Sequence, residues 1–324
     1  MHQRAELFSS GRFNRYHTKS FLAAVSEGNL SMTWKRVATA VVLIPVVVGL
    51  VLATGTAWVA VAISGVMLLA LFEYFALGDA VGHRAYKVWT AVCACLLMYA
   101  QYLAAMEYSH SAGGVTPIHR TLGLFEIKGP TVADVLFIFL MGIAAMTLAT
   151  RRPLVEALPA AGISSSALML VALPLTYAIR LHGVSLVGKW LLLFALVITW
   201  VGDTVAYFAG RSFGRHPFAP HLSPKKTWEG AVASFAGSVA AAWAMAHWGR
   251  VNVATVHVMG IAAAGNVAGQ MGDLLESAYK RSAGVKDSGA LLPGHGGILD
   301  RIDALILTFP VVWYYWLWIY SPRV

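Results

Sequence analysis

The sequence predicts an all-α integral membrane protein that crosses the bilayer about nine times, with its N-terminus in the cytoplasm. Of the 324 residues, 58% are hydrophobic and 12% are charged, whereas soluble domains carry about 25% charged residues. The mean hydropathy is +0.66. The apolar runs are continuous rather than alternating, which favours helices over barrel strands. This composition excludes a soluble enzyme, a disordered chain and a disulfide scaffold.

Each predicted span is a mostly apolar run of about 20 residues, the length that crosses a hydrocarbon core about 30 Å thick. Nine runs qualify: 37–54, 56–77, 88–107, 131–150, 159–181, 187–209, 228–248, 253–279 and 300–319. The fifth contains Pro174, which membrane helices tolerate. We expect a polar cytoplasmic tail over 1–35 rather than a cleavable signal peptide, then N-terminal transmembrane helices over 36–186 and a C-terminal transmembrane region over 187–324.

The basic residues are distributed unevenly between the two sides of this topology. On the side of the N-terminus lie 18 of the 24 lysines and arginines, and 6 lie on the other side. Basic loops mark the cytoplasmic side of a membrane protein. The net charge of +9 is therefore attributed to cytoplasmic loops and not to nucleic-acid binding.

Acidic residues concentrate in the C-terminal region. Seven of the 15 lie there: Asp203, Glu229, Asp273, Glu276, Asp287, Asp300 and Asp303. A carboxylate within a membrane costs several kcal/mol unless it is paired or binds a metal. Helical spacing places Asp273, Glu276 and Lys280 on one face, and Asp300 and Asp303 on another. Three spans would thus bring acids to the cytoplasmic leaflet, where we expect a shared polar cavity; the alternative is a structural ion-pair network.

Acids that converge with lysines suggest Mg²⁺ and a polyphosphate. The Ser-Pro dipeptide at 223–224 precedes Lys225 and Lys226 and predicts a helix N-terminus, which favours an anion. The segment Pro-Gly-His-Gly-Gly at 293–297 precedes the last span in the same way, and its glycines allow close approach of the backbone to a ligand. The plainer interpretations are an ordinary basic loop for the two lysines and a loop histidine for His295.

One segment is specific enough to indicate a family. The run 277–303 contains Ser-Ala-Tyr-Lys-Arg, then Lys-Asp, then Pro-Gly-His-Gly-Gly-Ile-Leu-Asp-Arg-Ile-Asp. It closely resembles the signature of phosphatidate cytidylyltransferases, also called CDP-diacylglycerol synthases. Shorter matches are Phe72-Glu73-Tyr74, Asp203-Thr204, Gly210-Arg211 and the run 223–230. Tyr279 departs from the pattern, which has an aliphatic residue or Phe there, and Glu73 alone is more typical of helix pairing.

The resemblance implies a membrane enzyme, often dimeric, that uses Mg²⁺ and a second metal, K⁺. It would convert CTP and phosphatidic acid into CDP-diacylglycerol and pyrophosphate, and 187–324 would be its catalytic region. Asp273 and Asp300 match the family's metal carboxylates. With this chemistry we expect Asp203 and Asp303 as further metal ligands; Asp287, Lys226 and His295 beside Asp273 and Asp300 in catalysis; and Lys225, Lys226, Arg211, Lys280, Arg281, Lys286 and Arg301 on the phosphates.

We expect a homodimer in a bacterial inner membrane, with the active site facing the cytoplasm and no nucleic-acid partner. Two other functions compete. A CTP-dependent lipid kinase would need the same nucleotide and metal. A secondary transporter would place its carboxylates at the bilayer midplane and would usually show internal repeats, whereas here the acids gather near one leaflet.

Overall fold

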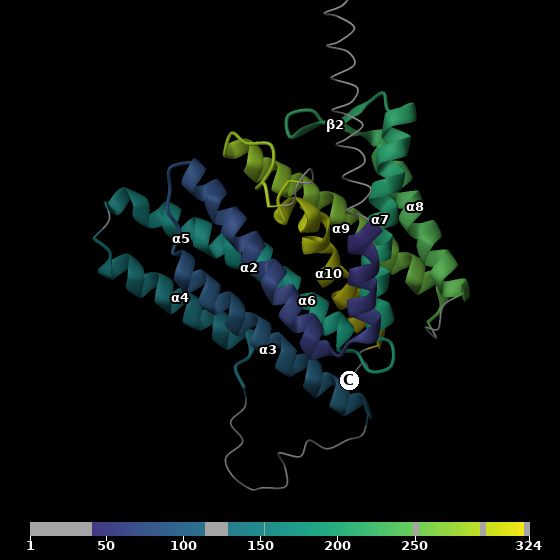
Figure 1. Cartoon of the computed structure of the whole chain (residues 1–324), viewed down its shortest axis with the longest axis horizontal. Helices are drawn as coiled ribbons and strands as arrows, with labels where there is room; N and C mark the ends of the chain where they lie inside the picture. The colour runs from purple at the N-terminus through teal and green to yellow at the C-terminus, as the bar shows by residue number, and fades with distance from the viewer. Residues whose placement is uncertain (1–40, 114–128, 152, 249–252, 292–295, 321–324) are drawn as a thin grey trace, which may run out of the picture. The chain divides into compact units, whose positions relative to one another are not determined.

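The computed structural model describes residues 41–113, 129–151, 153–248, 253–291 and 296–320. The chain forms two compact units, Met1–Val46 and Val47–Val324. The described residues of the first unit, 41–46, are helical. The apolar helix Val41–Ala53 includes the boundary between the two ranges. The elements described below belong to the second unit, and Figure 1 labels most of them.

The N-terminal part of the second unit consists of long apolar helices. These are α2 (Thr56–Ala80), α3 (Lys87–Gly113) and α4 (Val132–Ala149). A capping box starts α4, because the Thr131 side chain accepts a hydrogen bond from the Asp134 backbone and the Asp134 carboxylate accepts one from the Thr131 backbone. Such reciprocal bonds satisfy amides that have no partner inside the helix.

The fifth expected span is one long helical run with a change of winding in its middle. It comprises the 3₁₀ turn η2 (Leu154–Glu156), α5 (Ala157–Ser166), the π-helical η3 (Ala167–Ala172) and α6 (Leu173–His182). Pro174 follows the π segment. Because proline has no amide hydrogen and its ring clashes with the preceding turn, regular α-helical bonding cannot pass through it, and the wider π turn accommodates this change.

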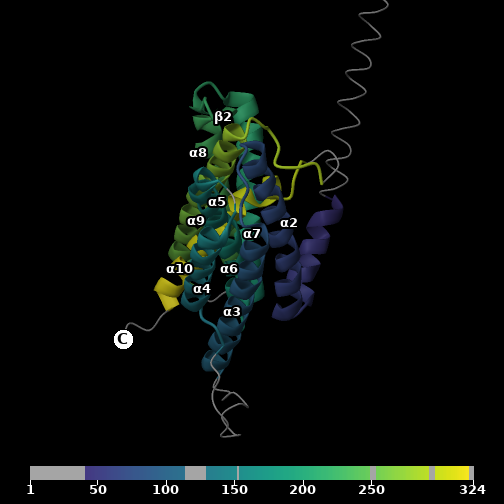
Figure 2. The same ribbon diagram turned by 90° about the vertical axis from the view of Figure 1, so that its left-hand side faces the viewer.

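The C-terminal part holds four helices and a small hairpin. These are α7 (Gly188–Phe213), β1 (Pro217–Ala219), β2 (Ser223–Thr227), α8 (Trp228–Trp248), α9 (Thr255–Ser282) and α10 (Leu299–Tyr320). The two strands pair antiparallel and lie at one end of α7 and α8 (Figure 2). The most extensive helix contacts are those of α7 with α8 and of α9 with α10. A Cβ atom on Gly269 of α9 would lie 2.9 Å from Thr308 Oγ1 of α10, so this glycine permits the close packing of the two helices.

The distribution of apolar side chains is that of a membrane protein. Large residues such as Phe139 and Phe309 are fully buried between helices, yet Phe72 and Leu148 are 70% and 87% exposed. On α2, Phe72 points outward while its neighbour Glu73 is buried. An apolar exterior with a polar residue inside is expected where lipid, not water, surrounds the helices.

The all-α membrane class is confirmed. Among the described residues, six helical segments are long and apolar enough to cross a membrane: Thr56–Ala80, Lys87–Tyr108, Val132–Ala149, Leu154–His182, Gly188–Phe213 and Leu299–Ile319. They match six of the expected spans. The helix Val41–Ala53 is shorter, and α8 and α9 form at the expected places without meeting the same criterion. The count of nine and the cytoplasmic N-terminus therefore stay predictions.

Candidate active site

A cavity of about 600 Å³ lies where α7, α8, α9 and the hairpin meet. Its polar lining includes Asp203, Tyr207, Arg211, Lys225, Lys226, Thr227, Ser234, Gln270 and Asp273. The spacing of Asp203, Tyr207 and Arg211 by four residues puts all three on one face of α7. Arg211 Nη1 donates to Tyr207 Oη over 3.0 Å. The cavity thus combines cations and carboxylates from elements far apart in the sequence.

The two lysines of the cavity lie on a strand, and the prediction of a helix N-terminus at Ser223-Pro224 was wrong. Residues 223–227 form β2, and the next helix begins at Trp228. Thr227 caps that helix, since its Oγ1 accepts a hydrogen bond from Gly230 N over 3.2 Å. A Ser-Pro dipeptide suits an edge strand as well as a helix start, so the dipeptide alone did not distinguish the two.

Acids from three helices gather beside these lysines. Lys226 forms an ion pair with Asp273 of α9. Asp203 of α7 and Asp303 of α10 lie close enough to Asp273 for their charges to repel. Lys226 and Arg301 partly offset this charge at Asp203. The three carboxylates therefore influence one another electrostatically, and Lys226 and Arg301 offset part of their charge.

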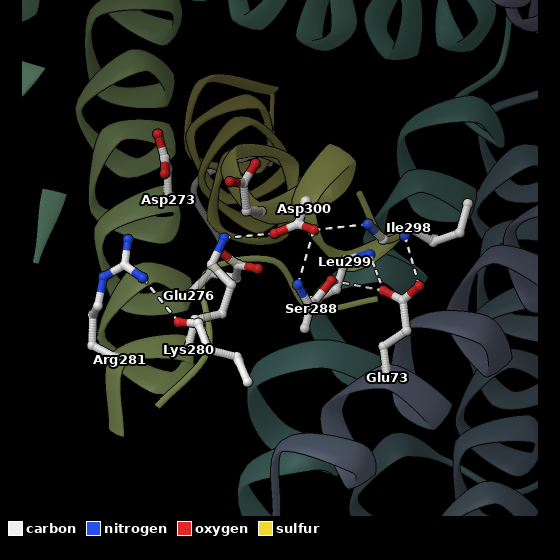
Figure 3. A network of polar contacts seen from close by, with 12 residues as sticks. Glu73, Asp273, Glu276, Lys280, Arg281, Ser288, Ile298, Leu299 and Asp300 are labelled. Atoms are coloured by element: carbon white, nitrogen blue, oxygen red, sulfur yellow. Dashed lines mark hydrogen bonds and ion pairs between the residues drawn. The ribbon is translucent and has the colours of Figure 1, made fainter. Parts of the chain in front are cut away.

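Asp300 belongs to an adjoining network that is largely buried (Figure 3). Its Oδ1 accepts a hydrogen bond from Lys280 Nζ over 2.6 Å, and its Oδ2 accepts from the backbone N–H of Ser288 and of Gly297 at 3.0 and 2.8 Å. Lys280 also pairs with Glu276, one turn earlier on α9. The side chains of Lys280 and Glu276 are 10% and 4% exposed. These charges are thus arranged with one lysine between two carboxylates.

A glycine shapes the loop around Asp300. Gly296 has a φ of +77°, and a Cβ atom there would lie 2.6 Å from Asp300 Oδ2. Residues with a side chain rarely adopt this φ, and here a side chain would also displace the carboxylate. Gly296 therefore allows the loop to pass against Asp300.

Glu73 of α2 anchors the start of α10 (Figure 3). Its Oε1 accepts a hydrogen bond from Ile298 N over 2.9 Å, and its Oε2 accepts from Leu299 N over 2.8 Å and from Ser288 Oγ over 2.9 Å. Glu73 is 5% exposed. A carboxylate at a helix N-terminus satisfies free amides and interacts favourably with the helix dipole. Glu73 and Asp300 thus both accept hydrogen bonds from the loop that leads into α10, and Asp300 itself lies at the start of that helix.

Other expected site residues lie around these two groups without a contact that fixes a role. Arg281 is exposed and donates to the carbonyl oxygens of Leu222 and Val285. Lys286 and Asp287 are exposed. His295 lies outside the described residues. The roles of all four stay predictions.

The carboxylates of the cavity meet only part of what a metal ion requires. Among the described residues, no three His, Cys, Asp or Glu side chains lie close enough together to hold a metal ion. Mg²⁺ is usually bound by only one or two carboxylates, with water and substrate phosphates completing its shell. Asp203 and Asp273 line the cavity and offer such hard oxygen donors. Asp300 is less available, since both of its oxygens already accept hydrogen bonds.

Sequence reasoning did not find every residue of the site. Glu73 was noted but interpreted as a helix-pairing residue, and Ser288 and Gln270 were not singled out. The available signal was the rarity of an acid within an apolar helix, which marks a candidate functional residue by itself. Nothing in the sequence indicated that α2 contacts the start of α10.

Comparison with known proteins supports one family. Residues 34–319 match the model of the "Cytidylyltransferase family". A protein of Haemophilus influenzae named phosphatidate cytidylyltransferase is 38% identical over 138 residues, which are 41% of this chain and 47% of that protein. Namesakes from Staphylococcus aureus and Bacillus subtilis are 41% and 38% identical over 125 and 142 residues, or 39% and 43% of this chain and 48% and 51% of those proteins.

These alignments span about half the length of the curated relatives. The family model is more extensive, since it matches nearly the whole chain from the first expected span to the last. The chain belongs to the cytidylyltransferase family.

Proposed function

We propose that this chain transfers the cytidylyl group of CTP to phosphatidate, giving CDP-diacylglycerol and pyrophosphate. The observation that carries the proposal is the cavity in which Lys225, Lys226 and Arg211 lie beside Asp203 and Asp273. Cations suit the triphosphate and the lipid phosphate, and the acids suit a divalent cation. The names of the matched relatives support the same reaction.

In this reaction an oxygen of the lipid phosphate attacks the α-phosphorus of CTP. The bond from the α-phosphorus to the bridging oxygen breaks, and pyrophosphate leaves with that electron pair. Both reactants are anionic, so the enzyme must bring them together in line and offset their charges. We assign this work to Lys225, Lys226 and Arg211. Because the lipid phosphate is already ionised, the reaction needs no strong base.

We further propose Mg²⁺ as the divalent cation, with Asp273 and Asp203 as its protein ligands. When bound, Mg²⁺ would neutralise charge on the triphosphate and on the leaving group. Lys226 is paired with Asp273, so this lysine must be able to exchange the carboxylate for a phosphate oxygen. The family resemblance is our reason to propose K⁺ as a second cation and to keep Asp300 as a candidate ligand. Asp303 stays a candidate ligand because its charge interacts with that of Asp273.

We also propose a homodimer in a bacterial inner membrane, with the cavity open to the cytoplasm. The uneven distribution of lysine and arginine supports this orientation, since 18 of 24 lie on the side of the N-terminus in the expected topology. CTP is a cytoplasmic nucleotide, and phosphatidate would enter from the inner leaflet between helices.

Product analysis with labelled CTP tests the reaction. The full chain, purified in detergent, is supplied with phosphatidate, Mg²⁺ and CTP labelled at either the α- or the γ-phosphorus, with and without a chelator. We expect label from the α-phosphorus in the lipid fraction, and none when metal is chelated. Lipid label from the γ-phosphorus alone would instead show a lipid kinase, and no lipid label from either position would refute both reactions.

A further inference from the structure

A series of hydrogen-bonded polar side chains on α8 and α9 leads from the cavity into the buried space between the helices. Asn266 Nδ2 donates to Ser234 Oγ and Ser238 Oγ over 2.9 and 2.8 Å. Gln270 Nε2 donates to Asn266 Oδ1 over 2.7 Å. Ser238 and Asn266 are 0% and 6% exposed. Polar side chains this deep in a membrane protein are costly and usually serve a function.

These hydrogen bonds have only one possible direction. Ser238 Oγ lies 2.6 Å from the carbonyl oxygen of Ile198, to which it must donate its single hydrogen. Its oxygen can then only accept, so the amide nitrogen of Asn266 must face it. The oxygen of the Asn266 amide therefore faces Gln270. Because that oxygen can only accept, Gln270 must donate to it through its amide nitrogen.

A second contact fixes Gln270 independently. Its Nε2 lies 3.1 Å from the backbone carbonyl oxygen of Ala231, which can only accept. Both hydrogens of the Gln270 amide are thus used, by Ala231 and by Asn266. If the Gln270 amide were flipped, its oxygen would lie against two acceptors. The hydrogen-bond network therefore defines which end of the amide is the nitrogen.

The remaining polar atom of this amide is Oε1, which can only accept a hydrogen bond. Gln270 lines the cavity, three residues before Asp273 on the same helix. Within the part of the chain that the structure describes, no donor bonds Gln270 Oε1. Gly202 of α7 permits the arrangement, since a Cβ atom there would lie 2.6 Å from Ser238 Oγ and 2.7 Å from Asn266 Nδ2. A residue that lines the cavity therefore has an acceptor held in one orientation, one turn from a carboxylate of the acid cluster.

The two proposed substrates differ in what they offer to an acceptor. The glycerol esters of phosphatidate carry only acceptors. The cytosine base of CTP carries an exocyclic amine, a donor, where uracil has a carbonyl oxygen, an acceptor. A buried acceptor left facing another acceptor is strongly disfavoured. The fixed oxygen therefore suits the nucleotide rather than the lipid, and cytosine rather than uracil.

We propose that Gln270 Oε1 accepts a hydrogen bond from the exocyclic amine of cytosine and so selects CTP over UTP. This inference rests on the proposed function, because it takes CTP as the nucleotide in the cavity. Asn266, Ser234 and Ser238 act as positioning residues that fix the amide of Gln270.

Two substitutions separate the acceptor of Gln270 from the general effect of losing a buried amide. Gln270→Leu removes the acceptor oxygen together with the bonds donated to Ala231 and Asn266. The measured quantity is the ratio of kcat/KM for CTP to kcat/KM for UTP, in the purified full chain. A general loss of folded enzyme lowers both values and leaves their ratio unchanged. Gln101→Leu is the matched control, because it removes a buried glutamine that bonds Arg180 and does not line the cavity.

We expect Gln270→Leu to lower the CTP:UTP ratio of kcat/KM at least about 10-fold. This is the factor by which losing about one hydrogen bond to the base reduces the preference for CTP over UTP. Gln101→Leu should keep the wild-type ratio. An unchanged ratio in Gln270→Leu would overturn the proposal, as would an equal fall in Gln101→Leu.

Deoxy-CTP tests whether the oxygen serves the sugar instead. If Gln270→Leu lowers the preference for CTP over dCTP and leaves the CTP:UTP ratio unchanged, the acceptor meets the ribose, and the assignment to the base is refuted. Equilibrium binding of CTP and UTP to the same variants gives the ratio without turnover. Wild-type protein that makes no CDP-lipid would defeat the proposed function, whereas turnover with a ratio insensitive to Gln270→Leu would defeat this inference alone.

Discussion

Replacing Glu73 by glutamine tests how the start of α10 is held in place. The carboxylate accepts three hydrogen bonds, from Ser288 Oγ, Ile298 N and Leu299 N. A glutamine side chain has one acceptor oxygen. In its best orientation that oxygen keeps the bonds from Ser288 and Leu299, and the amide nitrogen then faces the N–H of Ile298. One backbone donor is left buried without a partner, and the negative charge at the helix N-terminus is lost.

These losses set the expected magnitude. A buried donor without a partner costs about 1–3 kcal/mol, and a charge at a helix end contributes about 0.3–1 kcal/mol, more where it is partly buried. Glu73→Gln should therefore destabilise the protein by roughly 1–4 kcal/mol. Because Asp300 accepts from Ser288 N and Gly297 N of the same loop, turnover should fall as well.

Thermal unfolding of the detergent-solubilised chain, followed by tryptophan fluorescence, measures the effect on stability. Glu156→Gln is the matched control, because Glu156 pairs with His83 at a site where both side chains are partly exposed, 26% and 36%, and such pairs contribute about 0–1 kcal/mol. We expect a clearly lower unfolding temperature for Glu73→Gln alone. Equal unfolding temperatures for the two variants would refute the reasoning.

Three further predictions concern the charged groups. Lys226→Ala should raise the KM for CTP or phosphatidate with a smaller effect on kcat, since Lys226 is assigned to phosphate binding; an unchanged KM in steady-state kinetics would return this lysine to an ordinary loop role. Lys280→Met should destabilise the chain by about 3–5 kcal/mol, because it leaves Glu276 and Asp300 without their shared buried cation; thermal unfolding near the wild-type temperature would contradict this. Removing divalent cations with a chelator should abolish turnover and added Mg²⁺ should restore it, which a lipid-product assay checks; turnover without divalent cation would count against the metal.

The sequence predicted the class of the fold well, because the signal is local. A run of about 20 apolar residues is informative wherever the helix packs. Six expected spans appear as helices long and apolar enough to cross a membrane. The spacing of Glu276 and Lys280 by one helical turn likewise sufficed to predict that they share a face, and the two form an ion pair.

Features that depend on tertiary contacts could not be predicted in this way. The Ser-Pro dipeptide at 223–224 is compatible with a strand edge and with a helix start, and pairing with β1 decides the matter. The role of Glu73 depends on residues more than two hundred positions away. The fixed acceptor of Gln270 follows from bonds to Asn266 and Ala231, which no spacing rule predicts.

The central claim is that acids from α7, α9 and α10 act together with the lysines of β2 on the phosphates of CTP. Transfer of label from the α-phosphorus of CTP into lipid, compared between wild type, Asp273→Asn and Asp79→Asn, tests it most directly. Asp79 is the control, because it forms a half-exposed ion pair with Lys87 outside the cavity. We predict that Asp79→Asn keeps near wild-type transfer and that Asp273→Asn inserts and folds but retains less than about a tenth of it. Undiminished transfer by Asp273→Asn would contradict the account.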